Sequence, residues 1–186
     1  DILADFVKEK VEEGPVFVFG YHGKLQEVMS ILWERGINAP LVASGKVYEV
    51  AVACKKFGMK LEVLNSKSEE GKEAVKSGRF VAFYHARSAG ARKLALAMRA
   101  TIVELSGWQF SAPIVEERKR HYTVAFSDHA DFDGLLAYVE EARPKRVITD
   151  ARRIGDAEEL AKQIKRRLGI PAKPMPSKGT SGHEIL

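Results

Sequence analysis

The sequence predicts an α/β fold built on a mostly parallel sheet with helices on both faces. Short apolar runs rich in Val, Ile and Phe alternate with longer segments whose apolar residues recur at helical spacing. Short polar links separate the segments, and such a succession is typical of a parallel sheet covered on both sides. With 186 residues and 45% hydrophobic content, the chain is long enough for one or two units with a buried core.

The expected elements follow each other from the first residues. Each expected strand is a brief run of apolar or β-branched residues, as in the Val-Phe-Val-Phe of residues 16–19. Each expected helix is longer, and several begin beside Gly, Ser or Asp. In chain order the elements are helix 2–13, strand 16–19, helix 24–35, strand 40–43, helix 45–57, strand 61–64, helix 68–77, strand 80–84, helix 87–98, strand 100–105, strand 123–126, helix 133–142, strand 146–149, helix 156–168 and strand 172–175.

The weakest seam in this pattern lies at residues 109–120. Pro113, a run of charges and a break in the helix and strand alternation fall there. We therefore expect residues 1–108 to form one α/β unit, and residues 109–176 to be strands and helices that complete another. Residues 177–186 are polar and rich in Gly and Ser, which indicates a frayed tail. A start at Asp1 that runs directly into a helix-like stretch favours a piece of a longer protein.

Composition limits the compartment and the partners. The net charge of +5 permits nucleic-acid binding without requiring it. A single cysteine, Cys54, rules out an intramolecular disulfide and suits a reducing cytosol, so we expect a cytoplasmic protein. No apolar run approaches the roughly 20 residues that span a bilayer, and no secretory signal is visible, so we expect no membrane association.

The most informative segment is Ser127-Asp128-His129-Ala130-Asp131, between a strand-like run and an amphipathic helix. At such a turn, side chains and free helix amides can converge on an anion. The alternative is purely structural: Ser127 or Asp128 caps the helix, and Asp131 complements the helix dipole.

Two further strand-to-helix turns are candidate phosphate sites. Gly23 and Lys24 open the helix after residues 16–19, and at this turn the backbone can approach a phosphate closely. An equal alternative is a tight structural turn with an exposed His22. In the second turn, His85 and Arg87 are placed to meet a phosphate, and Ser88 either helps them or caps the following helix.

A third candidate follows the strand at residues 100–105. Ser106 and the Gly107 amide are suited to a phosphate contact. Trp108 is suited to stacking on a base, but a Trp beside a strand more often lies in the core, and we favour the core position.

Ser-Asp-His-Ala-Asp, with its helix and the following Pro-Lys-Arg-Val-Ile-Thr at residues 144–149, resembles the C-terminal signature of the β-CASP branch of metallo-β-lactamase nucleases. This branch includes Artemis-like DNA nucleases, ligase-associated DNA exonucleases and RNA 3′-end processing endonucleases. The apolar strand at residues 16–19 and the helix opening with Gly23 and Lys24 are similar to the family's pattern. Ser106-Gly107-Trp108 resembles a motif of the DNA-directed exonucleases. The resemblance covers most of residues 1–176.

The resemblance implies a hydrolase that cleaves phosphodiester bonds in DNA or RNA, in DNA repair or RNA processing. Residues 1–108 would be the β-CASP domain, and residues 109–176 the return of the chain into the metallo-β-lactamase fold. In the complete enzyme, two zinc ions would activate water. His129 would serve as general acid or charge stabiliser, oriented by Asp128 or Asp131.

The chain departs from the family in its metal ligands. The family's His-x-His-x-Asp-His cluster is absent, since no two of the five histidines lie within five residues of each other. Asp150 stands where RNA-processing members have a zinc-binding His, so the resemblance implies Asp150 as the metal ligand at that position. We therefore expect the chain alone to hold no zinc tightly and to be inactive, with the missing metallo-β-lactamase portion or a second copy as partner.

Two alternatives remain. The first is a non-catalytic nucleic-acid-binding or scaffold protein of the same fold. The second is a nucleotide-binding α/β domain that uses the turn at residues 20–24.

Overall fold

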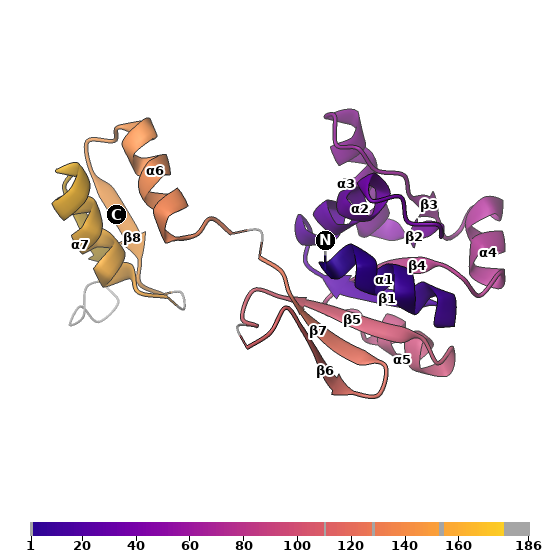
Figure 1. Ribbon diagram of the computed structural model, residues 1–186. Helices are drawn as coiled ribbons and strands as arrows, with labels where there is room; N and C mark the ends of the chain where they lie inside the picture. The colour runs from indigo at the N-terminus through magenta and orange to yellow at the C-terminus, as the bar shows by residue number, and fades with distance from the viewer. Residues whose placement is uncertain (1, 110, 128, 153–154, 177–186) are drawn as a thin grey trace. The chain divides into compact units, whose positions relative to one another are not determined.

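The computed structural model describes residues 2–109, 111–127, 129–152 and 155–176. The chain forms two compact units, Asp1–Asp128 and His129–Leu186 (Figure 1). Within the described residues, no helix combines the length and apolar character needed to cross a membrane.

The first unit is built on a seven-stranded sheet of order β3-β2-β4-β1-β5-β7-β6, parallel except for its edge strand β6 (Figure 1). This confirms the predicted α/β class. The strands are β1 (Val16–Gly20), β2 (Leu41–Ala43), β3 (Leu64–Asn65), β4 (Val81–His85), β5 (Thr101–Ser106), β6 (Ile114–Arg118) and β7 (His121–Ala125). The helices are α1 (Ile2–Glu13), α2 (Lys24–Glu34), α3 (Gly45–Lys56), α4 (Glu69–Lys76) and α5 (Ala89–Ala97).

Alternation along the central strand β1 shows why both faces of the sheet are covered. Val16 and Val18 point to one face, and Phe17 and Phe19 to the other, and all four are at most 1% exposed. The valines pack with α1, α2 and α3, whereas the phenylalanines pack with α4 and α5. Burial on both faces explains why β1 has no polar residues, since a strand covered on both sides carries an unbroken apolar run.

The hairpin of β6 and β7 moves the division of the chain from the expected 108/109 to 128/129. β7 pairs in parallel with β5, and β6 pairs with β7 alone, so both strands belong to the first sheet. The strand β6 was not predicted. It is an edge strand with exposed Glu116, Glu117 and Arg118, and edge strands commonly carry charges that hide their strand character.

The other expected elements are present: helix 2–13 and strand 172–175 have the predicted bounds, and the ends of the rest are shifted. The largest shift concerns β3, which is only Leu64–Asn65 instead of the expected residues 61–64. Leu61 is 2% exposed and belongs to the core, so its apolar character reflects packing outside a strand.

The second unit comprises α6 (Phe132–Ala142), β8 (Val147–Asp150), α7 (Ala157–Leu168) and β9 (Ala172–Met175). The two strands are parallel and joined through α7. Its core consists of Leu136, Ala161, Ile164 and Ala172 with partly buried neighbours.

The helix after the Ser127–Asp131 segment is capped by Asp131. Its Oδ1 accepts a hydrogen bond of 2.7 Å from the Gly134 amide, and its backbone is extended, as an N-cap requires. The expected cap at Ser127 or Asp128 is therefore wrong. The helix begins at Phe132, and the residue directly before it, Asp131, is the N-cap. His129 lies outside any helix or strand, as predicted.

We expect Asp131→Ala to destabilise α6 by about 1 kcal/mol, because an orphan amide loses its acceptor. Ser127→Ala should leave α6 unchanged. Hydrogen exchange of the Gly134 amide, followed by NMR, measures the effect directly.

Asp156→Ala provides a matched control, since Asp156 caps α7 in the same way through a 2.9 Å bond from the Glu159 amide. It should accelerate exchange at Glu159 and leave Gly134 unaffected. Faster exchange at Gly134 in the Ser127 variant would contradict the assignment of the cap.

Candidate functional site

The topology places a switch point at the carboxyl edge of the sheet, between the neighbouring strands β1 and β4. The helix that follows β1, α2, covers one face, whereas the helix that follows β4, α5, covers the other. Because the chain leaves these neighbouring strands in opposite directions, the strand ends are not covered, and ligands of open α/β sheets bind at such positions.

One aromatic and two imidazole rings lie together after the ends of β1 and β4. The ring of His85 lies 5.4 Å from that of His22 and 5.1 Å from that of Tyr21, measured between centroids. A 2.8 Å bond from the Ala86 amide to the Gly20 carbonyl ties the two turns together. The Arg87 amide donates to Nδ1 of His85 at 3.2 Å, so that nitrogen is an acceptor.

The turn after β1 is shaped by Gly23, whose φ of 93° belongs to the left-handed region that favours glycine. Its amide donates to Oε1 of Gln26 at 2.9 Å, and Gln26, fully buried, also donates to the Val47 carbonyl at 3.2 Å. These bonds fix the start of α2 and place Lys24, only 9% exposed, at its first position.

Lys24, Ser127 and Gly107 come together from three strand ends. A methyl group built on Gly107 would lie 3.4 Å from Nζ of Lys24 and 3.5 Å from Oγ of Ser127. An ammonium and a hydroxyl therefore flank a space that only the absent side chain of Gly107 leaves open. The segments involved follow β1, β5 and β7, which are neighbours in the sheet.

The remaining candidates of the first unit lie at the same edge. Oγ of Ser106 accepts a 3.1 Å bond from the Trp108 amide. Trp108 is 64% exposed, so the expected core position is wrong. Ser88 stands at the N-cap of α5 without a side-chain capping bond, and Arg87 is exposed.

The candidates His129, Asp131 and Asp150 belong to the second unit. Oδ1 of Asp150 accepts a 3.0 Å bond from the Arg152 amide. Asp128 lies outside the described residues. Among the residues that the structure describes, no group of three or more His, Cys, Asp or Glu side chains is placed to hold a metal ion.

Sequence reasoning missed a charged network inside the first unit. Glu104, on β5, accepts a short hydrogen bond of 2.5 Å from Arg92 and one of 2.8 Å from Nε2 of His121. Arg92 also donates to the Ala86 carbonyl at 2.8 Å and lies over the Phe19 ring. A lone Glu inside the apolar run of residues 100–105 was the available signal, since a buried carboxylate requires partners.

The network sets the ionisation of Glu104. Partial burial alone would raise the pKa of its carboxyl group, but the hydrogen bonds and positive charge of Arg92, together with His121, bring the pKa below the usual 4.5. Nδ1 of His121 accepts a 3.1 Å bond from Nε of Arg118, so Nε2 carries the proton that is donated to Glu104.

We expect Glu104→Gln to destabilise the first unit at neutral pH, because Arg92 loses its charged partner. Since the folded-state pKa of Glu104 is below 4.5, its stabilisation is present above pH 4.5 and disappears as the pH falls through the lowered value. Urea unfolding of both proteins between pH 7 and pH 3 should therefore show curves that converge in acid. Glu117→Gln, an exposed position on β6, should change little. A difference for Glu104→Gln that does not vary with pH would contradict the assignment.

Comparison with known proteins adds one partial similarity. Over 58 residues, the chain is 41% identical to a protein of Acidianus ambivalens described as "Uncharacterized protein in lig 3'region". The aligned segment is 31% of this chain and only 41% of that protein. A scan against protein-family models gives no match.

Proposed function

We propose that this chain binds the phosphodiester backbone of DNA or RNA at the carboxyl edge of its first sheet, as a portion of a metal-dependent nuclease. The observation that carries the proposal is the convergence of Lys24 and Ser127 on the space beside Gly107. A phosphate oxygen needs a positive charge, hydrogen-bond donors and close backbone approach, and this position offers all three.

The surroundings of Lys24 strengthen its attraction for a phosphate. Its side chain is 9% exposed, so water screens its charge less than that of a surface lysine. The hydroxyl of Ser127 adds a neutral donor. Such contacts fix the register of a strand and carry no sequence information, so we propose binding that is independent of base sequence.

The turns that follow β1 and β4 supply a second element of the same interface. Tyr21 is 48% exposed and His85 lies against it, so flat rings flank the path of a backbone that continues from Lys24. Trp108 offers a further exposed ring. Rings next to phosphate contacts are typical of single-stranded nucleic-acid binding.

In the complete enzyme, we propose that His129 assists the departing oxygen as a general acid. Asp131, whose Oδ1 caps α6, would hold the start of that helix and with it the backbone of His129. The described residues provide no set of ligands for zinc, so the metal-binding residues would come from the metallo-β-lactamase portion outside this chain.

Exposed apolar side chains of the second unit support such a partner. Phe132, Leu135, Tyr138 and Ile148 are between 38% and 71% exposed. They line a pocket formed by α6, β8 and α7. Large apolar groups gathered on one surface are typical of protein contacts.

We expect binding of a short oligonucleotide to weaken steeply with salt, because phosphate contacts release counterions. Lys24→Met, which keeps the apolar stem but removes the charge, should lower the slope of log K against log salt by about one, and Arg87→Ala by about one. Fluorescence anisotropy at several salt concentrations measures this slope.

Lys72→Met is the matched control, because Lys72 is exposed on α4, where it pairs with Glu69 of the same helix. It should leave the slope unchanged. No binding at low salt, or an identical slope in Lys24→Met, would exclude this interface.

We expect Gly107→Ala to weaken the same binding while the protein stays folded. The new methyl group would make ordinary contacts at 3.4 and 3.5 Å, but it would occupy the space proposed for a phosphate oxygen. Gly90→Ala is the matched control, since a methyl group there meets nothing within 4 Å. Equal affinity of the Gly107 and Gly90 variants, with equal thermal stability, would show that this space is not used.

A further inference from the structure

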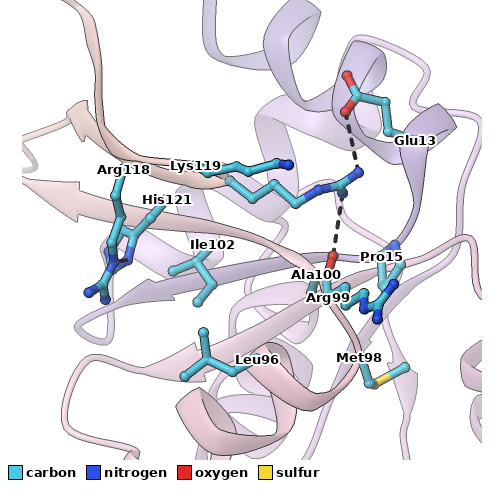
Figure 2. Close-up of a pocket in the computed structure, with 11 residues that line it drawn as sticks. Glu13, Pro15, Leu96, Met98, Arg99, Ala100, Ile102, Arg118, Lys119 and His121 are labelled. Carbon is cyan, nitrogen blue, oxygen red and sulfur yellow. Dashed lines mark hydrogen bonds and ion pairs between the residues drawn. The ribbon is translucent and has the colours of Figure 1, made fainter.

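A basic pocket lies at the opposite, amino edge of the first sheet. Its volume is about 630 Å³, within the range of small-molecule sites. It is formed where β1, β5 and β7 begin, together with the end of α5 and the turn between β6 and β7. Figure 2 shows the apolar side chains of Leu96, Met98 and Ile102 with charged side chains around them.

The lining carries a clear excess of positive charge. Arg99, Arg118, Lys119 and Arg120 face a single carboxylate, Glu13. Glu13 already pairs with Lys10 at 2.8 Å. It also lies 3.9 Å from Arg120, the pair that Figure 2 marks with a dashed line. In the part of the chain that the structure describes, no carboxylate pairs with Arg99, Arg118 or Lys119. An anionic ligand would therefore meet cations that are not neutralised.

Two of these arginines occupy backbone conformations that favour glycine. Arg99 follows the last turn of α5 with φ of 51°, and Arg120 lies in the β6–β7 turn with φ of 61°. Both are positions at which glycine is the unstrained residue. Non-glycine residues in this region are uncommon, and such strain gathers at functional sites. Here both strained positions direct an arginine to the same pocket.

Arg120 is itself held in place. One guanidinium nitrogen donates to the Arg99 carbonyl at 3.3 Å, and another lies 3.9 Å from Glu13. Arg118 is held by its 3.1 Å bond to His121. Side chains fixed before binding lose less conformational entropy when a ligand arrives.

We propose that this pocket binds the phosphate groups of a nucleoside phosphate, with its base against Leu96, Met98 and Ile102. The planar guanidinium groups of the arginines match phosphate oxygens in geometry and charge. The apolar side chains of Leu96, Met98 and Ile102 match a flat base. The nucleoside phosphate is either a free nucleotide or the phosphorylated terminal nucleotide of a strand.

The pocket is separate from the interface around Gly107. The two sites lie at opposite ends of β1 and β5, roughly 17 Å apart for a strand of this length. No residue is shared between them. Binding at this pocket therefore does not depend on binding at the carboxyl edge.

The test is isothermal titration of the full chain with ADP at low salt. We expect saturable binding that weakens about tenfold in Arg99→Gly and again about tenfold when Lys119→Ala is added, because charged contacts to phosphate are lost. Arg99→Gly should keep or raise the thermal stability, since glycine adopts this conformation without strain. Loss of binding would then not reflect unfolding.

Arg143→Gly is the matched control. Arg143 has the same left-handed conformation, φ 46°, at the end of α6, and does not line the pocket. It should bind ADP as the unmodified chain does, and so should Lys24→Met.

Competition separates the two sources of the ligand. A trinucleotide with a 5′-phosphate that displaces ADP, when its 5′-hydroxyl form does not, supports the pocket as a site for strand ends. If neither form of the trinucleotide displaces ADP, the result supports a site for free nucleotides. Absence of ADP binding, equal weakening in Arg143→Gly, or displacement by pyrophosphate at the same concentration as ADP would overturn the proposal.

Discussion

Burial of the first sheet on both faces is the constraint on which the rest of this structure depends. Phe17 and Phe19 pack against α4 and α5, while Val16 and Val18 pack against α1, α2 and α3. A sheet enclosed in this way has no room for uncompensated polar groups in its interior. Ligand chemistry is therefore confined to the two edges at which the strands begin and end. Glu104 on β5 is only partly buried, and its charge is compensated by Arg92 and His121.

The two edges differ because the helices around a parallel sheet run opposite to its strands. At the carboxyl edge, helices begin, and their free amides add to the positive charge of Lys24. At the amino edge, helices end, and the carbonyls at the ends of α1 and α5 favour cations such as Lys10 and Arg99. This difference explains how several arginines and a lysine are accommodated around one pocket. Both edges thus carry cationic side chains, although different ends of the helices lie beside them.

The second unit is too small to bury its apolar residues in the same way. Two strands and two helices enclose a core around Leu136 and Ile164 and leave Tyr138 and Ile148 largely exposed. Sheets of two strands are marginal without further packing. The proposal of a covering partner follows from this imbalance between apolar surface and core.

The sequence by itself determined the α/β class, nearly every helix and strand, and the turns that carry the candidate residues, because these depend on local periodicity and on Gly, Ser and Asp at element ends. It misplaced the cap of α6 at Ser127 or Asp128, because several side chains in this short polar segment are of the types that cap helices. Only the tertiary structure shows that Asp131 accepts the hydrogen bond from the Gly134 amide. It also missed β6, because this edge strand carries charged residues, as exposed edge strands often do. Only the tertiary structure decided that Lys24, Gly107 and Ser127 meet, and that Arg99 and Arg120 share a pocket. These residues are far apart in the chain, and their proximity depends on strand order, which no local pattern encodes.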